Sequence, residues 1–308
     1  MMALRVDKPG MLSTVQDLGR WGYQNLGVPV AGPMDRCSHR LANVLLGNPP
    51  EAATLEVTLI GPELTAERRT HLVVTGAEFD LFLDDATVPT GVPLNVPAGS
   101  RFRFGRRRRG ARAYVAVPGG FDVPIWLGSR ATHLPSGLGG LAGRALVAGD
   151  CLGSRETAAA AVPTVRRRGP VLALPEGGAR IRVMLGPQEA LCAPEGIETF
   201  RTTRYAVTDR SDRMGYRLSG PAVTLASSAE PLSDATPTGT VQIPGSGQPI
   251  VLMADGQTTG GYPKLATVIS ADLPVAGQLG PGDWMEFAVC DRAAALRALI
   301  AQEQALLA

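Results

Sequence analysis

The chain has 308 residues, with 30 basic and 28 acidic side chains, so its net charge is +2. At roughly 100–200 residues per domain, this length predicts two domains. Hydrophobic residues make up 44% and charged residues 19%, which provides a sizeable core and excludes a disordered chain. The 37 glycines and 25 prolines indicate many turns, and therefore short strands rather than long helices.

Several classes of protein are excluded by what the sequence lacks. No uninterrupted apolar run reaches 18 residues, and the first residues do not have the charged and apolar regions of a signal peptide. We therefore expect a cytoplasmic protein that does not enter a membrane. The cysteines form no C-x-x-C pair and the histidines share no ligand spacing, so we predict reduced thiols and no metal site; these residues are Cys37, Cys151, Cys192, Cys290, His39, His71 and His133.

The first half of the chain predicts one helix and several strands. The helix covers 34–46, where apolar residues recur at helical spacing; Pro33 or Asp35 opens it and Gly47 closes it. Strand patterns follow, the first two of them separated by a tight turn at Gly76-Ala77; the predicted strands are 70–75, 78–83, 94–96, 101–104 and 113–117.

The second half of the chain also predicts several short strands and one helix, and a predicted linker separates it from the first half. Residues 154–170 lose the strand pattern and carry alanine, proline and arginine runs, which is typical of a linker. A C-terminal helix is predicted over 291–307, with Asp291 as its N-cap. The predicted strands between linker and helix are 181–185, 205–208, 241–243, 250–254 and 284–289. We therefore predict two β-rich units, 1–155 and 170–308.

Two arginine runs, 106–109 and 166–168, raise the question of nucleic-acid binding. The net charge is small and no aromatic residues are interleaved with these arginines, so we interpret the runs as a solvated hairpin tip and part of the linker. No nucleic-acid partner is expected.

The densest group of polar residues lies between positions 255 and 264. A buried strand would deliver a carboxylate there, and the glycines that follow let the backbone approach a ligand closely. The alternative is a polar turn with a solvated lysine. Lys264 is unusual because Lys8 is the only other lysine in the chain. The candidate residues are Asp255, Gln257, Thr258, Thr259, Gly260, Gly261, Tyr262 and Lys264.

Two further segments offer carboxylate–arginine sets. In 211–218, Asp212 and Arg213 would point to opposite faces of a strand, so each would pair elsewhere, either with substrate or in a structural salt bridge. Before the first helix, Asp35 could contact a substrate or cap the helix.

These segments carry a resemblance to a known family. The stretches TVQDLGRWGYQNLGVP (14–29), GPMDRCSHRLANVLLGNP (32–49), SDRMGYRLSGP (211–221), GQPIVLMADGQTTGGYPKLATVISADLP (247–274) and GQLGPGDWMEF (277–287) occur in this order. Together they resemble the allophanate hydrolase subunit 2 family, also called biotin-dependent carboxyltransferase, which includes one of the subunits of 5-oxoprolinase.

The resemblance implies a mainly β fold of two cyclophilin-like β-barrel units with few short helices. It implies a component, active only in a complex, of an ATP-dependent 5-oxoprolinase that opens 5-oxoproline to glutamate. The expected partners are a subunit 1 protein, which is the B-type component of 5-oxoprolinase, and a third, A-type component, with ATP as co-substrate. Alternatives are a carboxyltransferase acting on urea or a related small amide, and a non-catalytic regulatory partner of subunit 1. The sequence has no Met-Lys-Met biotinylation site, so biotin would be carried by a separate protein.

For a small amide or lactam substrate we expect Lys264 to bind a carboxylate or polarise the carbonyl. Asp255 would orient the amide N–H or move a proton, and Gln242 and Thr259 would add hydrogen bonds. In the same hypothesis the remaining polar candidates bind substrate; they are Gln257, Thr258, Gly260, Gly261, Tyr262, Asp212, Arg213 and Asp35.

Overall fold

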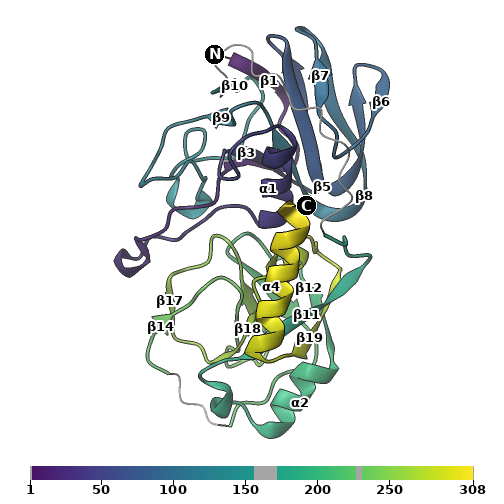
Figure 1. Cartoon of the computed structure of the whole chain (residues 1–308). Coiled ribbons are helices and arrows are strands. Elements are labelled where there is room, and N and C mark those ends of the chain that lie inside the picture. Colours follow the sequence, from purple (N-terminus) through teal and green to yellow (C-terminus); the bar gives the residue numbers. More distant parts are fainter. Residues whose placement is uncertain (1, 156–171, 227–230, 308) are drawn as a thin grey trace. The chain divides into compact units, whose positions relative to one another are not determined.

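The computed structural model describes residues 2–155, 172–226 and 231–307. The chain divides into two compact units (Figure 1). The first consists of Met1–Trp21 and Ala31–Leu174, and the second of Gly22–Val30 and Pro175–Ala308. The short segment 22–30 thus groups with the second unit, although it precedes most of the first in sequence. Most of the predicted linker, 154–170, lies outside the described residues.

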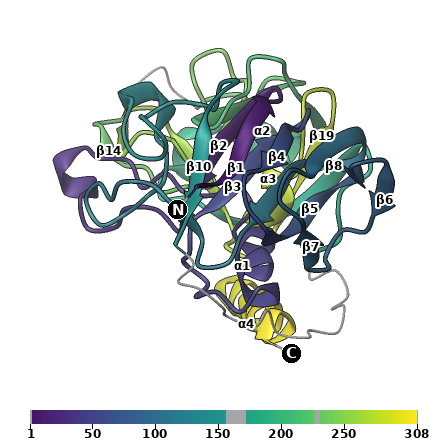
Figure 2. The same ribbon diagram turned by 90° about the horizontal axis from the view of Figure 1, so that it is seen from above.

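The first unit is built on one antiparallel sheet of ten strands, shown with its helix in Figure 2. The hydrogen-bonded path is β2-β3-β8-β4-β1-β10-β9, and β5 joins it through β8 while also pairing with β6 and β7. The elements are β1 (Met2–Lys8), β2 (Leu12–Gln16), α1 (Arg36–Leu45), β3 (Thr54–Thr58), β4 (Glu63–Ala66), β5 (Thr70–Leu83), β6 (Ala86–Val88), β7 (Leu94–Val96), β8 (Arg101–Ala116), β9 (Phe121–Asp122), a 3₁₀ turn (Leu134–Ser136) and β10 (Cys151–Ser154).

The predicted turn at Gly76-Ala77 is wrong. The chain continues through it as the single strand β5, paired with β8 over most of its length. The register shifts near Gly76, whose φ of 84° lies in the region that favours glycine. A glycine in this conformation inside a strand is typical of a β-bulge, which bends the strand without ending it.

The arginine run 106–109 lies inside β8, so the prediction of a hairpin tip is wrong. Its side chains are solvent-exposed, and two of them pair with acidic residues of β5. Arg108 binds both oxygens of Asp80, at 3.0 and 2.8 Å, and Arg109 binds both oxygens of Glu78, at 2.9 and 2.7 Å. The run therefore lies on the solvent-exposed surface of the strand pair formed by β5 and β8.

Helix α1 confirms the predicted helix and its cap. The carboxylate of Asp35 accepts hydrogen bonds from the Ser38 backbone N–H at 2.9 Å and from the Ser38 hydroxyl at 2.6 Å. Ser38 lies three residues beyond Asp35, the position from which an N-cap carboxylate receives its backbone bond.

The second unit is a closed barrel with strand order β11-β18-β15-β16-β13-β12-β19, completed by a parallel pairing of β11 with β19. The fully buried rings of Phe200 and Phe287 stack with their centroids 4.3 Å apart. The elements are two 3₁₀ turns (Gln24–Leu26, Glu189–Leu191), β11 (Gly178–Leu185), α2 (Pro194–Thr202), β12 (Arg204–Val207), β13 (Gly215–Ser219), β14 (Asp234–Ala235), β15 (Thr240–Gln242), β16 (Ile250–Leu252), β17 (Thr259–Gly260), β18 (Lys264–Val268), α3 (Leu273–Gly277), β19 (Trp284–Val289) and α4 (Arg292–Leu307).

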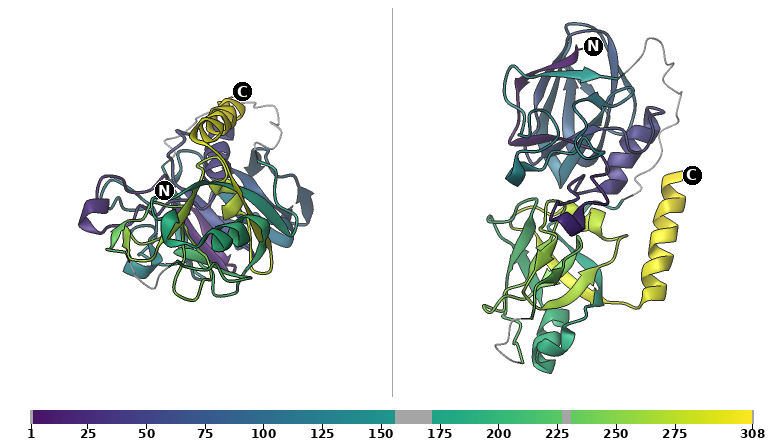
Figure 3. Two further views of the ribbon diagram at one scale, coloured as in Figure 1. Left: turned by 90° about the horizontal axis from the view of Figure 1, so that it is seen from below. Right: turned by 90° about the vertical axis from the view of Figure 1, so that its left-hand side faces the viewer.

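Helix α4 runs alongside the second barrel (Figure 3). Asp291 caps it as predicted, because its carboxylate accepts from the Ala294 N–H at 2.7 Å. The Gln302 side chain ties the helix to the barrel through the Ala271 carbonyl, at 2.8 Å. Helix α2 was not predicted, although Pro194 and the acidic Glu195 in its first turn are local start signals.

The prediction of a mainly β fold with barrel-like units and few helices is confirmed. No helix in the described ranges has the length and apolar character needed to cross a membrane.

His39, on α1, predicts an acid sensitivity of the first unit. Its side chain is fully buried, with Nδ1 2.8 Å from the Thr54 hydroxyl, and burial lowers its pKa to about 3. The unfolded chain takes up this proton near pH 6.5 and the folded chain near pH 3, so stability is lost as the pH falls through this window. The loss is about 1.4 kcal/mol per pH unit.

The measurement is urea unfolding at pH 7 and pH 4.5. We expect the His39→Asn variant to be less stable at pH 7 but to lose about 2–3 kcal/mol less than the unmodified protein on acidification. Equal losses in the two proteins would show that His39 does not titrate in this way.

Candidate functional site

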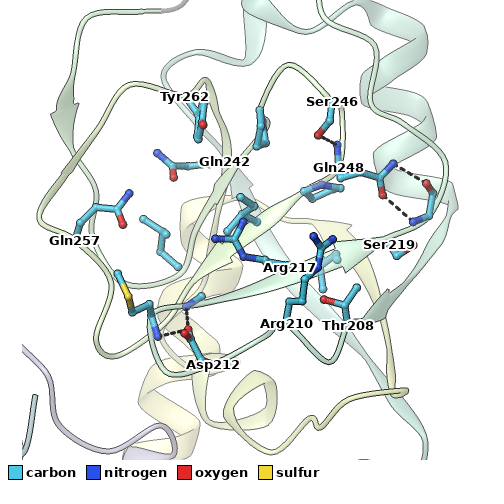
Figure 4. Close-up of a pocket in the computed structure, with 18 residues that line it drawn as sticks. Thr208, Arg210, Asp212, Arg217, Ser219, Gln242, Ser246, Gln248, Gln257 and Tyr262 are labelled. Atoms are coloured by element: carbon cyan, nitrogen blue, oxygen red, sulfur yellow. Dashed lines mark hydrogen bonds between the residues drawn. The ribbon is translucent and has the colours of Figure 1, made fainter. Parts of the chain in front are cut away.

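A cavity of about 670 Å³ opens on the second barrel (Figure 4). Its volume lies within the roughly 300–1,000 Å³ typical of small-molecule sites. Strands β13, β15 and β16 contribute to its wall, together with residues of the loops 208–212 and 244–249 and with Gln257 and Tyr262. The residues predicted from sequence that line it are Asp212, Gln242, Gln257 and Tyr262.

Gln242, at the end of β15, has an unsatisfied donor in this cavity. The residue is 1% exposed, and its Nε2 has no hydrogen-bond partner among the described residues. Leaving a buried amide unpaired costs about 1–3 kcal/mol. Gly260 lies against this amide, because a Cβ at that position would be 2.5 Å from Nε2 and would displace the end of the Gln242 side chain. Gln242 thus lines the cavity with an amide whose Nε2 is unpaired within the described part of the chain and is shielded from solvent by its neighbours, including Gly260.

Asp255 does not line the cavity. It is 1% exposed and its two carboxylate oxygens bind Arg213, which is 3% exposed, at 3.0 and 2.8 Å. The backbone N–H of Asp255 also donates to the Arg213 carbonyl, at 2.8 Å. The interpretation of Arg213 as half of a salt bridge to another segment is confirmed. This geometry supports a positioning role for Asp255, since its oxygens are engaged by the guanidinium.

Lys264 begins strand β18, so the alternative of a solvated lysine in a polar turn is wrong. The residue is 3% exposed, and its Nζ lies 3.4 Å from Oε1 of Gln188, which also accepts from the Lys264 backbone N–H at 3.0 Å. Within the described ranges no carboxylate lies within 4.0 Å of this ammonium. Lys264 is the cross-strand partner of Gln242, so the two donors belong to adjacent strands.

The other predicted residues lie around these. Thr259 and Gly260 form β17, which pairs with β14, and the Thr258 carbonyl accepts from the Thr236 N–H at 2.9 Å. None of the segment 258–261 lines the cavity. Asp35 lies in the first unit, fully buried, and caps α1 as described above.

Sequence reasoning missed two arginines of the cavity wall, Arg210 and Arg217. The strand alternation in 215–219 carried part of the signal, because it places Arg217 on the face opposite Tyr216 and Leu218. No local sequence pattern indicated that Arg210 lines the same cavity as Arg217. Across the described residues, no three His, Cys, Asp or Glu side chains gather as a metal site would require.

The Arg213–Asp255 pair predicts a large stability effect. Asp255→Ala would leave a buried guanidinium without its carboxylate, and we expect a loss of about 3–5 kcal/mol in the free energy of unfolding. The double variant Arg213→Met/Asp255→Ala should be more stable than Asp255→Ala alone, because it removes the unpaired charge.

Equilibrium denaturation measures both effects, with Asp209→Asn, an exposed carboxylate of the same unit, as the control. An Asp255→Ala variant within about 0.5 kcal/mol of the unmodified chain, the size of an ordinary surface effect, would contradict the role of this pair.

Comparison with known proteins places these features in a family. Residues 26–289 match the family model described as "Carboxyltransferase domain, subdomain A and B". The chain is 39% identical over 297 residues to the C subunit of 5-oxoprolinase from Escherichia coli, covering 96% of this chain and 94% of that protein. It is 38% identical to the Haemophilus influenzae protein of the same name, covering 89% and 87%.

A solved structure gives the same result. The urea carboxylase of Kluyveromyces lactis superposes with a TM-score of 0.93 at 32% identity, over 99% of this chain but 29% of that one. The resemblance found in the sequence is thus confirmed, and the chain belongs to the carboxyltransferase-domain family, together with proteins named as the C subunit of 5-oxoprolinase.

Proposed function

We propose that this chain is a component of an ATP-dependent 5-oxoprolinase, a hydrolase complex that opens the lactam ring of 5-oxoproline to glutamate. The observation that carries this proposal is the 39% and 38% identity to two proteins named as the C subunit of 5-oxoprolinase, over most of each chain. ATP would act as co-substrate of the complex. The partners would be a subunit 1 protein of the 5-oxoprolinase B type and a protein of the A type, in the cytoplasm.

Within the complex, the cavity of the second barrel would contribute to the substrate site. The Gln242 amide would donate to the lactam carbonyl, with Gln257 and Tyr262 on the same wall. Lys264, on the strand next to Gln242, would supply positive charge as the carbonyl oxygen becomes negative. Asp255 would hold the site through Arg213, and residues 258–261 would shape the loop beside it.

The proposal predicts that activity requires the assembled complex. Co-expression with the A-type and B-type proteins should give a co-purifying assembly that converts 5-oxoproline to glutamate only when ATP is present. Omission of this chain should abolish that conversion. An assembly that forms but leaves 5-oxoproline unchanged would contradict the proposed reaction.

A second candidate is carboxyl transfer to urea or a related small amide, with biotin on separate proteins. The structural likeness to urea carboxylase favours it. Biotin-dependent carboxylation of urea by the chain, mixed with biotin carboxylase and carrier proteins, would distinguish this function. A non-catalytic partner of subunit 1 would bind that protein without making the complex active.

Lys264 gives the sharpest test of the site within the chain. We expect Lys264→Met to lower kcat/KM of the complex roughly tenfold to a hundredfold, as loss of one charge-assisted contact of about 1.5–3 kcal/mol implies. Because the ammonium is buried without a nearby carboxylate, the same change should leave stability equal or higher. Lys264→Arg should restore little, since a planar guanidinium does not replace a compact ammonium.

The matched control is Lys8→Met, the other lysine, which lies in the first unit and forms an exposed ion pair with Glu63 at 2.7 Å. This change should alter neither kcat/KM nor, beyond about 1 kcal/mol, stability. If Lys264→Met retains full kcat/KM, Lys264 has no part in the reaction.

A further inference from the structure

The wall of the cavity carries an excess of positive charge. Arg210 and Arg217 both line it, whereas Asp212 is the one carboxylate among the described residues that do so. The Asp212 carboxylate is engaged by the backbone, because Oδ1 accepts from the N–H groups of Met214 at 2.8 Å and Gly215 at 3.2 Å. This carboxylate forms no ion pair with either guanidinium group, and two arginines against one aspartate leave the described wall with a net positive charge.

A tight turn places the two arginines together. The Ser211 hydroxyl accepts from the Arg217 N–H at 3.0 Å and donates to the Arg217 carbonyl at 3.3 Å. The Thr208 N–H donates to the same carbonyl at 3.0 Å. The chain thus folds back on itself between β12 and β13, and Arg210, on this turn, is fixed near Arg217. Figure 4 shows both guanidinium groups in the middle of the pocket.

Neither guanidinium has an ion pair or a side-chain hydrogen bond with any residue in the part of the chain that the structure describes. Other arginines of the same unit do pair: Arg182 binds Asp272 at 2.6 Å and Arg213 binds Asp255 at 2.8 Å. Two guanidinium groups at one site match the geometry by which arginine binds a carboxylate or phosphate, because each presents a rigid fork of N–H donors.

Two buried polar atoms in the same cavity also lack partners among the described residues. These are Oγ1 of Thr208, at the arginine end, and Nε2 of Gln242. In Figure 4, Gln242, Gln257 and Tyr262 lie on one side of the arginines, and Ser246 and Gln248 lie on the other. The cavity therefore presents a cationic centre, and Gln242 on its wall has hydrogen-bonding capacity that none of the described residues uses.

We propose that Arg210 and Arg217 form a carboxylate subsite, so that this cavity selects a small lactam or amide bearing a carboxylate over its neutral analogue. The ligand carboxylate would bind the two guanidinium groups and the Thr208 hydroxyl, and its amide would meet Gln242. The identity of the ligand as 5-oxoproline rests on the proposed function; the preference for a carboxylate rests on the cavity.

The test compares two ligands that differ by this group. The full-length chain is titrated with 5-oxoproline and with 2-pyrrolidinone, the same lactam without the carboxylate, and binding is followed by chemical shifts of the protein. We expect 5-oxoproline to bind at least roughly tenfold more tightly, the effect of one charge-assisted contact. Arg217→Gln and Arg210→Gln should each remove most of this difference and leave 2-pyrrolidinone binding unchanged. Added salt should weaken the binding of 5-oxoproline alone.

Arg297→Gln is the matched control, because Arg297 is an exposed arginine of the same unit on α4 and does not line the cavity. It should bind both ligands as the unmodified chain does. Equal binding of the two lactams, or binding of neither, overturns the carboxylate subsite. Tighter binding of inorganic phosphate than of 5-oxoproline, with the same dependence on Arg217, would assign the arginines to a phosphate and overturn it as well.

These outcomes are separable from failure of the proposed function. A complex without 5-oxoprolinase activity whose chain still prefers the carboxylated lactam, through Arg210 and Arg217, would retain the subsite and reject the reaction. An active complex in which Arg217→Gln leaves the KM for 5-oxoproline unchanged would retain the reaction and reject the subsite.

Discussion

The buried ion pair between Arg213 and Asp255 is the interaction on which the candidate site depends. It joins the loop before β13 to the turn after β16, and a backbone hydrogen bond between the same residues, at 2.8 Å, reinforces it. Asp212 and Met214, on either side of Arg213, line the cavity, as does Gln257, two residues beyond Asp255. A planar guanidinium bound through two nitrogens fixes orientation as well as distance, so this pair sets the rim of the site.

The cavity and the strands around it contain buried polar side chains that do not contribute to the stability of a closed barrel. A barrel core is stabilised by apolar packing, such as the stacked rings of Phe200 and Phe287. The unsatisfied Nε2 of Gln242 opposes that stability, and so does the buried charge of Lys264 on the neighbouring strand. Polar groups retained at such a cost are typical of binding sites, where a ligand supplies the missing partners. In the first unit, the buried Asp35 carboxylate has its partners on the adjoining helix, because it caps α1.

Relatives of this chain combine the same scaffold with different proteins. The match to the 5-oxoprolinase protein of Escherichia coli covers most of both chains, whereas in urea carboxylase the equivalent region is 29% of a much longer chain. Conservation of the fold at a TM-score of 0.93 therefore does not distinguish between lactam opening and carboxyl transfer. The side chains of the cavity wall do bear on that question, since a substrate with a carboxylate and a neutral one such as urea need different charges there.

Local patterns in the sequence determined the elements whose signals are short-range. The carboxylate of Asp35 caps α1 by accepting from a residue three positions along the chain, and the strand over Trp284–Val289 matches its prediction, because hydrophobic alternation and capping act over a few residues. The long motifs, through their resemblance to a known family, also identified the family to which the chain belongs.

Tertiary structure alone decided that Gly76 makes a bulge and not a turn, since pairing with β8 holds the strand together through it. It also brought Asp255 to Arg213, 42 residues away, buried Lys264, and placed Arg210 and Arg217 in the wall of one cavity. Such contacts depend on how distant segments meet when the barrel closes, and no spacing along the chain encodes them.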